Sequence, residues 1–209
     1  MVNVTKVECP EDLHCISQTG IAAAIWSRRP LPRFQAWMDG LSVNQLPKAR
    51  VILPLDKIRK VLSEIMDVCG TPRCNLREIL ADDMEALCTI FGNLTGSYYL
   101  SLCLETVTTD YSCGEFHINT FNERLFCTYR GEGIQYGFSI KGREPQRIRT
   151  VPTGAPIVLG GKLLSTDQKS RFVHRFPKIG GIGETHLLLM LDPADTITCK
   201  LKALHSSIH

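Results

Sequence analysis

The first half of the chain carries apolar residues at the spacing of helix faces. Positions three and four residues apart share one side of a helix, and four segments follow this pattern. The segments are residues 18–29, 31–41, 56–68 and 75–91. Asp56 stands where an N-cap belongs and Gly70 where a helix would end. We therefore expect residues 1–95 to be mainly helical, after an extended entry at residues 1–13 and with a short strand at residues 50–53.

After Gly92 the apolar period changes to that of strands. Leucines at positions 100, 102 and 104 alternate with residues such as Ser101 and Glu105, which predicts a strand at residues 98–109. Further runs favour strands and are separated by turns rich in glycine and proline. These runs are residues 115–119, 123–130, 134–140, 146–151, 156–159, 171–175 and 185–191. We expect residues 196–209 to form a last strand or an ordered tail.

About eight short strands without crossover helices favour an antiparallel barrel or jelly roll. The predicted class is therefore α+β, with an N-terminal helical layer packed on a C-terminal antiparallel β-barrel of the cupin or double-stranded β-helix kind. A length of 209 residues suits one domain. We expect a single domain over residues 1–209, with a mainly helical part at 1–95 and a barrel part at 96–209.

Composition and charge indicate an ordinary globular protein of a reducing compartment. The formal net charge is only +3, and the basic stretches at residues 141–149 and 169–178 read as solvated loops, so we expect no nucleic-acid partner. The nine cysteines include no C-x-x-C pair, and several lie in apolar runs as small buried hydrophobes. No apolar run suits a signal peptide or a membrane span. We expect a cytoplasmic protein that contacts no membrane.

Candidate chemistry concentrates at residues 113–119, where thiol, carboxylate, imidazole and amide groups follow one another closely. If this segment is a strand, Glu115, His117 and Asn119 share one face, because side chains alternate along a strand. A second histidine, His174, lies in a later predicted strand. A distant histidine brought back beside a first one is a common way to build a metal site in a barrel.

A histidine, an acidic residue two positions later and a distant histidine form the facial triad of non-haem iron oxygenases. His117 and His174 match the two imidazoles, whereas the acidic position holds Asn119, a neutral and poorer ligand. Glu115 or Glu123 could supply the carboxylate instead. We expect a divalent metal, iron or zinc, bound by His117 and His174 with Asn119 or Glu115 nearby.

Oxygenases that use 2-oxoglutarate hold its far carboxylate with an arginine or lysine that follows the distal histidine. Here that neighbourhood holds His186, so 2-oxoglutarate is a possible cofactor without its usual partner. Arg124 or Arg175 could act as a bidentate anion clamp, which makes a small anionic molecule a candidate ligand. Cysteine catalysis by Cys113 lacks a recognisable third orienting group.

Several segments, in the right order, resemble the bacterial family called domain of unknown function 1826 (DUF1826). They are Ile25-Trp26-Ser27-Arg28, Leu104-Glu105-Thr106-Val107, Phe116-His117-Ile118-Asn119, the block from Arg124 to Gly133, Val173-His174-Arg175 and the run from Leu187 to Asp192. Genes of this family are associated with zinc-responsive regulation and metal-chaperone GTPases. The resemblance therefore implies a link to zinc homeostasis and a metal-handling protein partner.

The family's usual pattern has aspartate where this chain has Asn119, and arginine where it has His186. Three functions remain open from the sequence. The protein is an enzyme like the non-haem iron oxygenases, a non-catalytic metal-binding protein in which a thiol such as Cys113 assists, or a degenerate barrel that serves as an interaction scaffold. A carboxylate or third histidine beside the two imidazoles would favour the enzyme, and a closed set of nitrogen and sulfur ligands would favour the metal-binding protein.

Overall fold

The computed structural model describes residues 2–107, 114–119, 123–140, 142–160, 170–177 and 184–194. Its strands are β1 (Asn3–Val7), β2 (Ile21–Trp26), β3 (Ala49–Pro54), β4 (Tyr99–Val107), β5 (Arg124–Arg130), β6 (Gln135–Ile140), β7 (Arg149–Thr150), β8 (Ile157–Leu159), β9 (Ser170–Arg175) and β10 (His186–Ala194). Its α-helices are α1 (Pro32–Gly40), α2 (Ile58–Val68) and α3 (Asn75–Thr95), and its 3₁₀ turns are η1 (Pro10–Ser17), η2 (Val43–Gln45) and η3 (Leu55–Lys57). The tail predicted at residues 196–209 lies outside this description.

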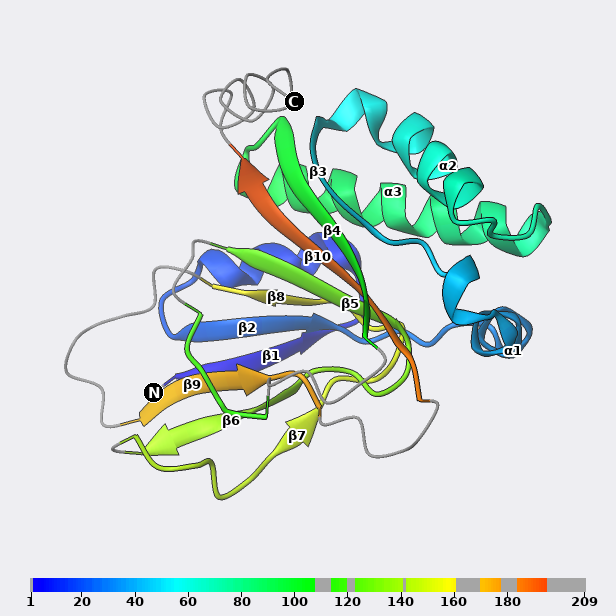
Figure 1. Cartoon of the computed structure of the whole chain (residues 1–209). Helices are drawn as coiled ribbons and strands as arrows, with labels where there is room; N and C mark the ends of the chain where they lie inside the picture. The colour runs from blue at the N-terminus through cyan, green and yellow to red at the C-terminus, as the bar shows by residue number, and fades with distance from the viewer. Residues whose placement is uncertain are drawn as a thin grey trace, which may run out of the picture.

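The strands form two sheets (Figure 1). The larger has seven strands in the order β1-β2-β8-β5-β10-β4-β3, and the smaller has three in the order β7-β6-β9. Neighbouring strands are antiparallel except β1 and β2, which run parallel. An apolar cluster between the sheets joins Phe126 and Ile157 of the large sheet to Tyr136 and Phe172 of the small one. The two sheets therefore pack face to face.

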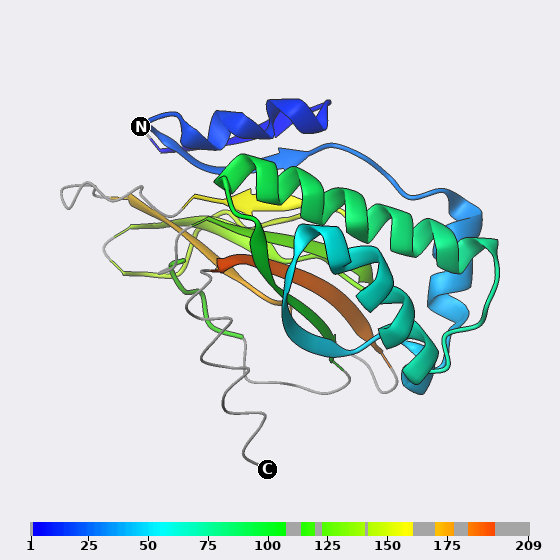
Figure 2. The ribbon, with the colours of Figure 1, turned by 90° about the horizontal axis from the view of Figure 1, so that it is seen from above.

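The large sheet is buried on both faces, as β10 illustrates. Leu187, Leu189 and Leu191 pack into the cluster on the helical side, whereas Leu188 packs into the cluster between the sheets. Figure 2 shows α3 and η1 lying over the outer face of this sheet. The helices and the small sheet thus cover the opposite faces of one central sheet.

Helix α3 forms because one of its sides is apolar throughout its length. Leu80, Met84 and Leu87 are fully buried on that side, and Gly96 ends the helix in the left-handed conformation at φ 64°. The prediction of an N-cap at Asp56 is wrong, because α2 begins at Ile58 after the turn η3. No helix in the described parts of the chain is both long and apolar enough to cross a membrane.

The segment predicted as a helix at residues 18–29 is instead the strand β2, between β1 and β8. Its residues Ala22 to Ile25 are all buried, and a strand covered on both faces reads as a continuous apolar run without alternation. Such a run is easily mistaken for a buried helix when alanines fill it. The first 95 residues therefore carry, besides their helices, three strands of the large sheet, β1, β2 and β3.

The mixed class of helices and strands is confirmed, but the sheets do not close into a barrel. No strand ladder joins the seven-stranded sheet to the three-stranded sheet within the described residues. The strand predicted at residues 115–119 is reduced to one isolated bridge, between His117 and His174. Side-chain packing therefore holds the two sheets together.

A charged cluster links α3 to the sheet. Arg28, which follows β2, binds both carboxylate oxygens of Asp83 at 2.5 and 2.8 Å, and its Nε donates to the Gly154 carbonyl. The hydroxyl of Tyr129 donates to the same carboxylate at 2.7 Å. Burial raises the pKa of Tyr129 well above its usual value. One aspartate thus satisfies an arginine and a tyrosine from two different strands.

Asp83→Ala should destabilise the protein by about 2–3 kcal/mol, because it leaves the guanidinium of Arg28 largely buried without its partner. Asp82→Ala is the matched control, since the neighbouring residue of α3 pairs with Arg59 in a more exposed position. That change should cost at most about 1 kcal/mol. Urea unfolding of both variants measures the two changes in the free energy of unfolding. Equal changes would show that the buried cluster stabilises the protein no more than the exposed ion pair does.

Candidate functional site

The candidate site is built on a backbone bridge between His117 and His174. The amide of His117 donates to the carbonyl of His174 at 3.0 Å, and the reverse bond is 2.9 Å long. Residues opposite each other in an antiparallel pair project to the same side. Their imidazole rings accordingly lie with centroids 4.3 Å apart. The structure therefore brings together the two histidines that the sequence singled out.

His174 lies in an aromatic environment between the sheets. Its ring centroid is 5.7 Å from that of Phe126 and 6.4 Å from that of Phe172, and only 2% of the residue is exposed. Burial, together with the nearby His117 and Arg124, lowers the pKa of His174 to about 3. Its Nδ1 is buried and has no hydrogen-bond partner among the residues that the structure describes. The imidazole is thus held neutral with one nitrogen unsatisfied.

The other predicted ligands differ in position. Asn119 is buried, whereas Glu115 and His117 are exposed. The backbone carbonyl of Glu115, rather than its carboxylate, approaches the Nδ1 of His117 at 3.4 Å. Within the ranges that the structure covers, no three histidine, cysteine, aspartate or glutamate side chains gather closely enough to hold a metal ion. Cys113 lies outside those ranges.

Arg124, a predicted anion clamp, is engaged within the large sheet. Its Nε and Nη2 bind the two oxygens of Asp192 at 2.5 and 2.9 Å. Its guanidinium also lies 5.8 Å from the centre of the Phe126 ring. The partner comes from β10, 68 residues later in the chain. Arg124 thus places a positive charge near His174, while the carboxylate of Asp192 already occupies its guanidinium group.

Arg175, the second predicted clamp, is held by neutral groups. It donates to the side chain of Gln135 at 2.8 Å and to the carbonyl of Gly114 at 2.9 Å. Its guanidinium lies 4.3 Å from the centre of the Phe116 ring, and Glu144 is 3.9 Å away. These contacts fix the segment that carries His117 against β9. Positioning that segment is the role the geometry gives to Arg175, and its role in binding substrate stays a prediction.

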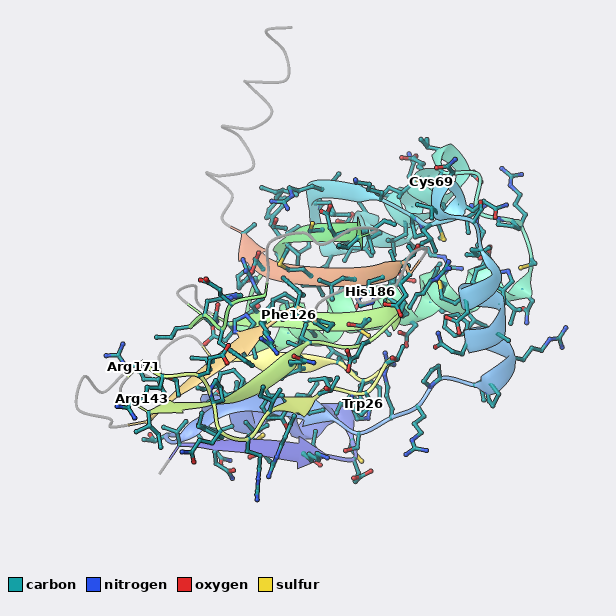
Figure 3. The ribbon with its side chains drawn as sticks, turned by 60° about the horizontal axis from the view of Figure 1, so that its bottom comes forward. Trp26, Cys69, Phe126, Arg143, Arg171 and His186 are labelled. Carbon is teal, nitrogen blue, oxygen red and sulfur yellow. The ribbon has the colours of Figure 1, made fainter. Side chains whose placement is uncertain are left out.

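His186 is the first residue of β10 and lies apart from Phe126 in Figure 3. It is almost buried, and burial lowers its pKa. Gly131 approaches it so closely that a Cβ atom there would lie 2.2 Å from the imidazole. The position where the family has arginine is therefore filled here by a tightly packed, largely neutral ring.

The aromatic side chains around His174 were not singled out from the sequence. Phe172 precedes His174 by two positions on β9, so the shared face was readable from strand alternation. Tyr136 pairs with His174 across β6 and β9, and Phe126 comes from the other sheet. No local pattern reveals such cross-strand and cross-sheet neighbours.

The fold is that of plant dioxygenases. The rice dioxygenase for auxin oxidation superposes with a TM-score of 0.50 at 11% identity, over 94% of this chain and 84% of that one. The dioxygenase for auxin oxidation 1 from Arabidopsis thaliana, solved with 2-oxoglutarate, gives 0.51 at 9% identity, over 94% of each chain. At such identities the likeness concerns the fold alone.

Within this fold class the sequence has a definite family. Residues 7–192 match the family described as "Protein of unknown function (DUF1826)", and the chain belongs to it. No curated protein matches the sequence. The resemblance seen in the sequence motifs is thereby confirmed.

His174 should make the metal-free protein sensitive to acid. Its pKa is about 3 when folded and about 6.5 when unfolded, so below pH 6.5 only the unfolded state gains the proton. Between pH 6.5 and 4, wild type should lose up to about 1.4 kcal/mol per pH unit relative to His174→Phe. Urea unfolding in chelator measures this, with exposed His14→Gln as control. Parallel pH profiles of wild type and His174→Phe would contradict it.

Gly131→Ala should cost more than Gly142→Ala. Both glycines have positive φ, 81° and 75°, but a Cβ meets the His186 ring only at position 131 and nothing within 4 Å at 142. We expect about 1 kcal/mol at Gly142 and at least about 2 kcal/mol at Gly131, measured by thermal unfolding. Adding His186→Ala should recover part of the difference. Equal losses in the two single variants would rule out the contact.

Proposed function

We propose that this protein binds one divalent metal ion in a jelly roll of the dioxygenase kind. The strand sequence supports the jelly roll. From β4 onward, through the bridge at His117, successive strands belong to the large, small, large, small, small, large, small and large sheets. This alternation wraps two antiparallel sheets around a shared interior, which needs no closed ladder.

The observation that carries the metal proposal is the paired imidazoles of His117 and His174. Metal ligation requires neutral imidazole, and burial keeps His174 in that form. The partnerless Nδ1 of His174 is a polar atom in an apolar enclosure, where an unsatisfied group is costly. The two rings come from different strands at a fixed backbone bridge, so their spacing is rigid. These features fit a metal ligand pair.

Asn119 would complete the protein ligands through its amide oxygen. The residue is buried and lies two positions after His117, as in a facial triad. A neutral amide supplies less charge than a carboxylate, so the site would hold its metal more weakly and with one more positive charge. Imidazole suits both iron and zinc. The dioxygenase fold favours iron, and the sequence resemblance favours zinc.

Residues around the proposed metal control the access of water and ligands to it. Phe126 and Phe172 exclude water from the His174 side, while exposed His117 leaves the opposite side open to ligands. When iron is bound, its redox chemistry with dioxygen is what this fold is used for in the dioxygenases. Arg175 holds the segment of His117 against β9 and so keeps the two imidazoles in register.

A second function, metal binding without catalysis, has support from the arginines. Arg124 is paired with Asp192, and the largely neutral His186 fills the place of the usual clamp for 2-oxoglutarate. A carboxylate cofactor would therefore find less positive charge than in a typical 2-oxoglutarate oxygenase. In this version the protein buffers metal or passes it to a protein partner.

Anaerobic titration with ferrous ion, and separately with zinc, tests the metal proposal. We expect one equivalent to bind wild type, and His117→Ala and His174→Ala to weaken binding at least tenfold, because each removes one of two strong ligands. Exposed His14→Ala is the control and should change nothing. Asn119→Asp should tighten binding of either ion, because it restores a charged oxygen ligand.

Absence of stoichiometric metal in wild type, or binding that survives both histidine variants, would overturn the proposal. Addition of 2-oxoglutarate to the ferrous protein then separates the two functions. A saturable change in the visible absorption of the metal would favour the oxygenase, and an unchanged spectrum would favour metal binding alone.

A further inference from the structure

A basic groove of about 630 Å³ lies along β6 and the connection to β7, reaching Asn3 of β1. Arg143, Arg147 and Arg149 line it, and Glu144 is the acidic residue among the lining. In Figure 3 Arg143 lies at the same end of the small sheet as Arg171. Arg171 follows Ser170 on β9 and pairs with Ser139 of β6. Arg143 and Arg171 therefore lie toward the Ile140 end of β6, whereas Arg149 lies opposite Tyr136, farther back along the strand.

The three arginines that line the groove differ from the arginines that form ion pairs within this protein. Arg28, Arg59, Arg73, Arg77, Arg124 and Arg175 all lie within 4 Å of a carboxylate oxygen. Among the residues the structure describes, no carboxylate pairs with Arg143, Arg147 or Arg149. Glu144 is directed to Arg175 instead. Within the described residues the groove thus carries an excess of positive charge, with three arginines and one glutamate in its lining.

The backbone that carries these arginines is held firmly against β6. Ser139 donates its hydroxyl proton to the Arg143 carbonyl at 2.7 Å, and the Arg143 amide donates to Ile140. At Gly137 a Cβ atom would lie 2.8 Å from the Arg147 carbonyl, so only glycine allows the connection to pack this closely. Arg149 pairs with Tyr136 in the sheet. The arginines are therefore fixed at their Cα positions before any ligand arrives.

The other wall of the groove is aromatic. Tyr136 and Phe138 line it, and Tyr136 is buried and sits opposite His174 in the β6–β9 ladder. Opposed residues of a ladder have Cβ atoms about 5 Å apart on the same side of the sheet. A ligand that reaches Tyr136 would therefore lie next to the residue that borders the candidate metal site.

We propose that this groove binds a small dianion, in which phosphate or paired carboxylates meet the arginines and a less polar part faces Phe138. Guanidinium forks match both kinds of anion, and the volume is in the range of small-molecule sites. The groove supplies the free positive charge that the engaged Arg124 and Arg175 do not. Its anion binding stands by itself, whereas a role for that anion as substrate rests on the proposed function.

Calorimetry at fixed ionic strength tests the groove with two probes, inorganic phosphate and succinate. Wild type should bind at least one of them at one site, and the probe that binds identifies the anion class. The double variant Arg147→Gln/Arg149→Gln should bind it at least about tenfold more weakly, since it removes two charge-assisted contacts. Arg33→Gln is the matched control, an exposed arginine of α1 outside the groove.

The proposal is overturned if neither probe binds saturably, or if Arg33→Gln weakens binding as much as the double variant does. The second result would mean that the anions respond to net charge alone. His117→Ala separates this proposal from the metal proposal. It should weaken metal binding at least tenfold and leave anion binding intact, so either proposal can fail without the other.

Discussion

The structure depends on one constraint, which is that the seven-stranded sheet is apolar on both faces. Leu187 and Leu189 of β10 need a cover on one side, and Leu188 needs one on the other. The helices supply the first cover and the small sheet supplies the second (Figure 2). Burial of apolar surface drives the packing of both covers, with a free-energy gain of about 25 cal/mol per Å² buried. The small sheet, and with it the candidate site, is thus positioned by the core rather than by a closed ladder.

The candidate site includes a segment that few backbone hydrogen bonds attach to the sheets. His174 sits in the apolar interior on β9, whereas one isolated bridge attaches His117 to the sheet in the part of the chain that the structure describes. The contacts of Arg175 with the Gly114 carbonyl and the Phe116 ring reinforce that attachment. One imidazole is therefore rigid and dry while the other is exposed. Such an asymmetry suits a site that must both hold an ion and admit a ligand.

Local patterns were enough to predict most of the β-rich half. The alternating leucines of residues 98–109 gave β4, and the two histidines were identified and do come together. The pattern failed at β2, because a strand buried on both faces loses its alternation. It also could not show that Arg124 is paired, since Asp192 lies 68 residues away. Residue type indicates which chemistry is available, whereas long-range pairing decides which charges remain free.

The arginines show how long-range pairing decides which charges can bind a ligand. Arg124 and Arg175 were predicted as anion clamps from the sequence, yet each is engaged in holding elements together. Free guanidinium groups are found where the sequence suggested only a solvated loop, in the connection between β6 and β7. If an anion is to approach the histidine pair, the electrostatic attraction comes from that side of the small sheet. The arginines that hold elements together are thus distinct from those proposed to bind an anion, and Tyr136, which lines the groove, lies opposite His174 in the ladder.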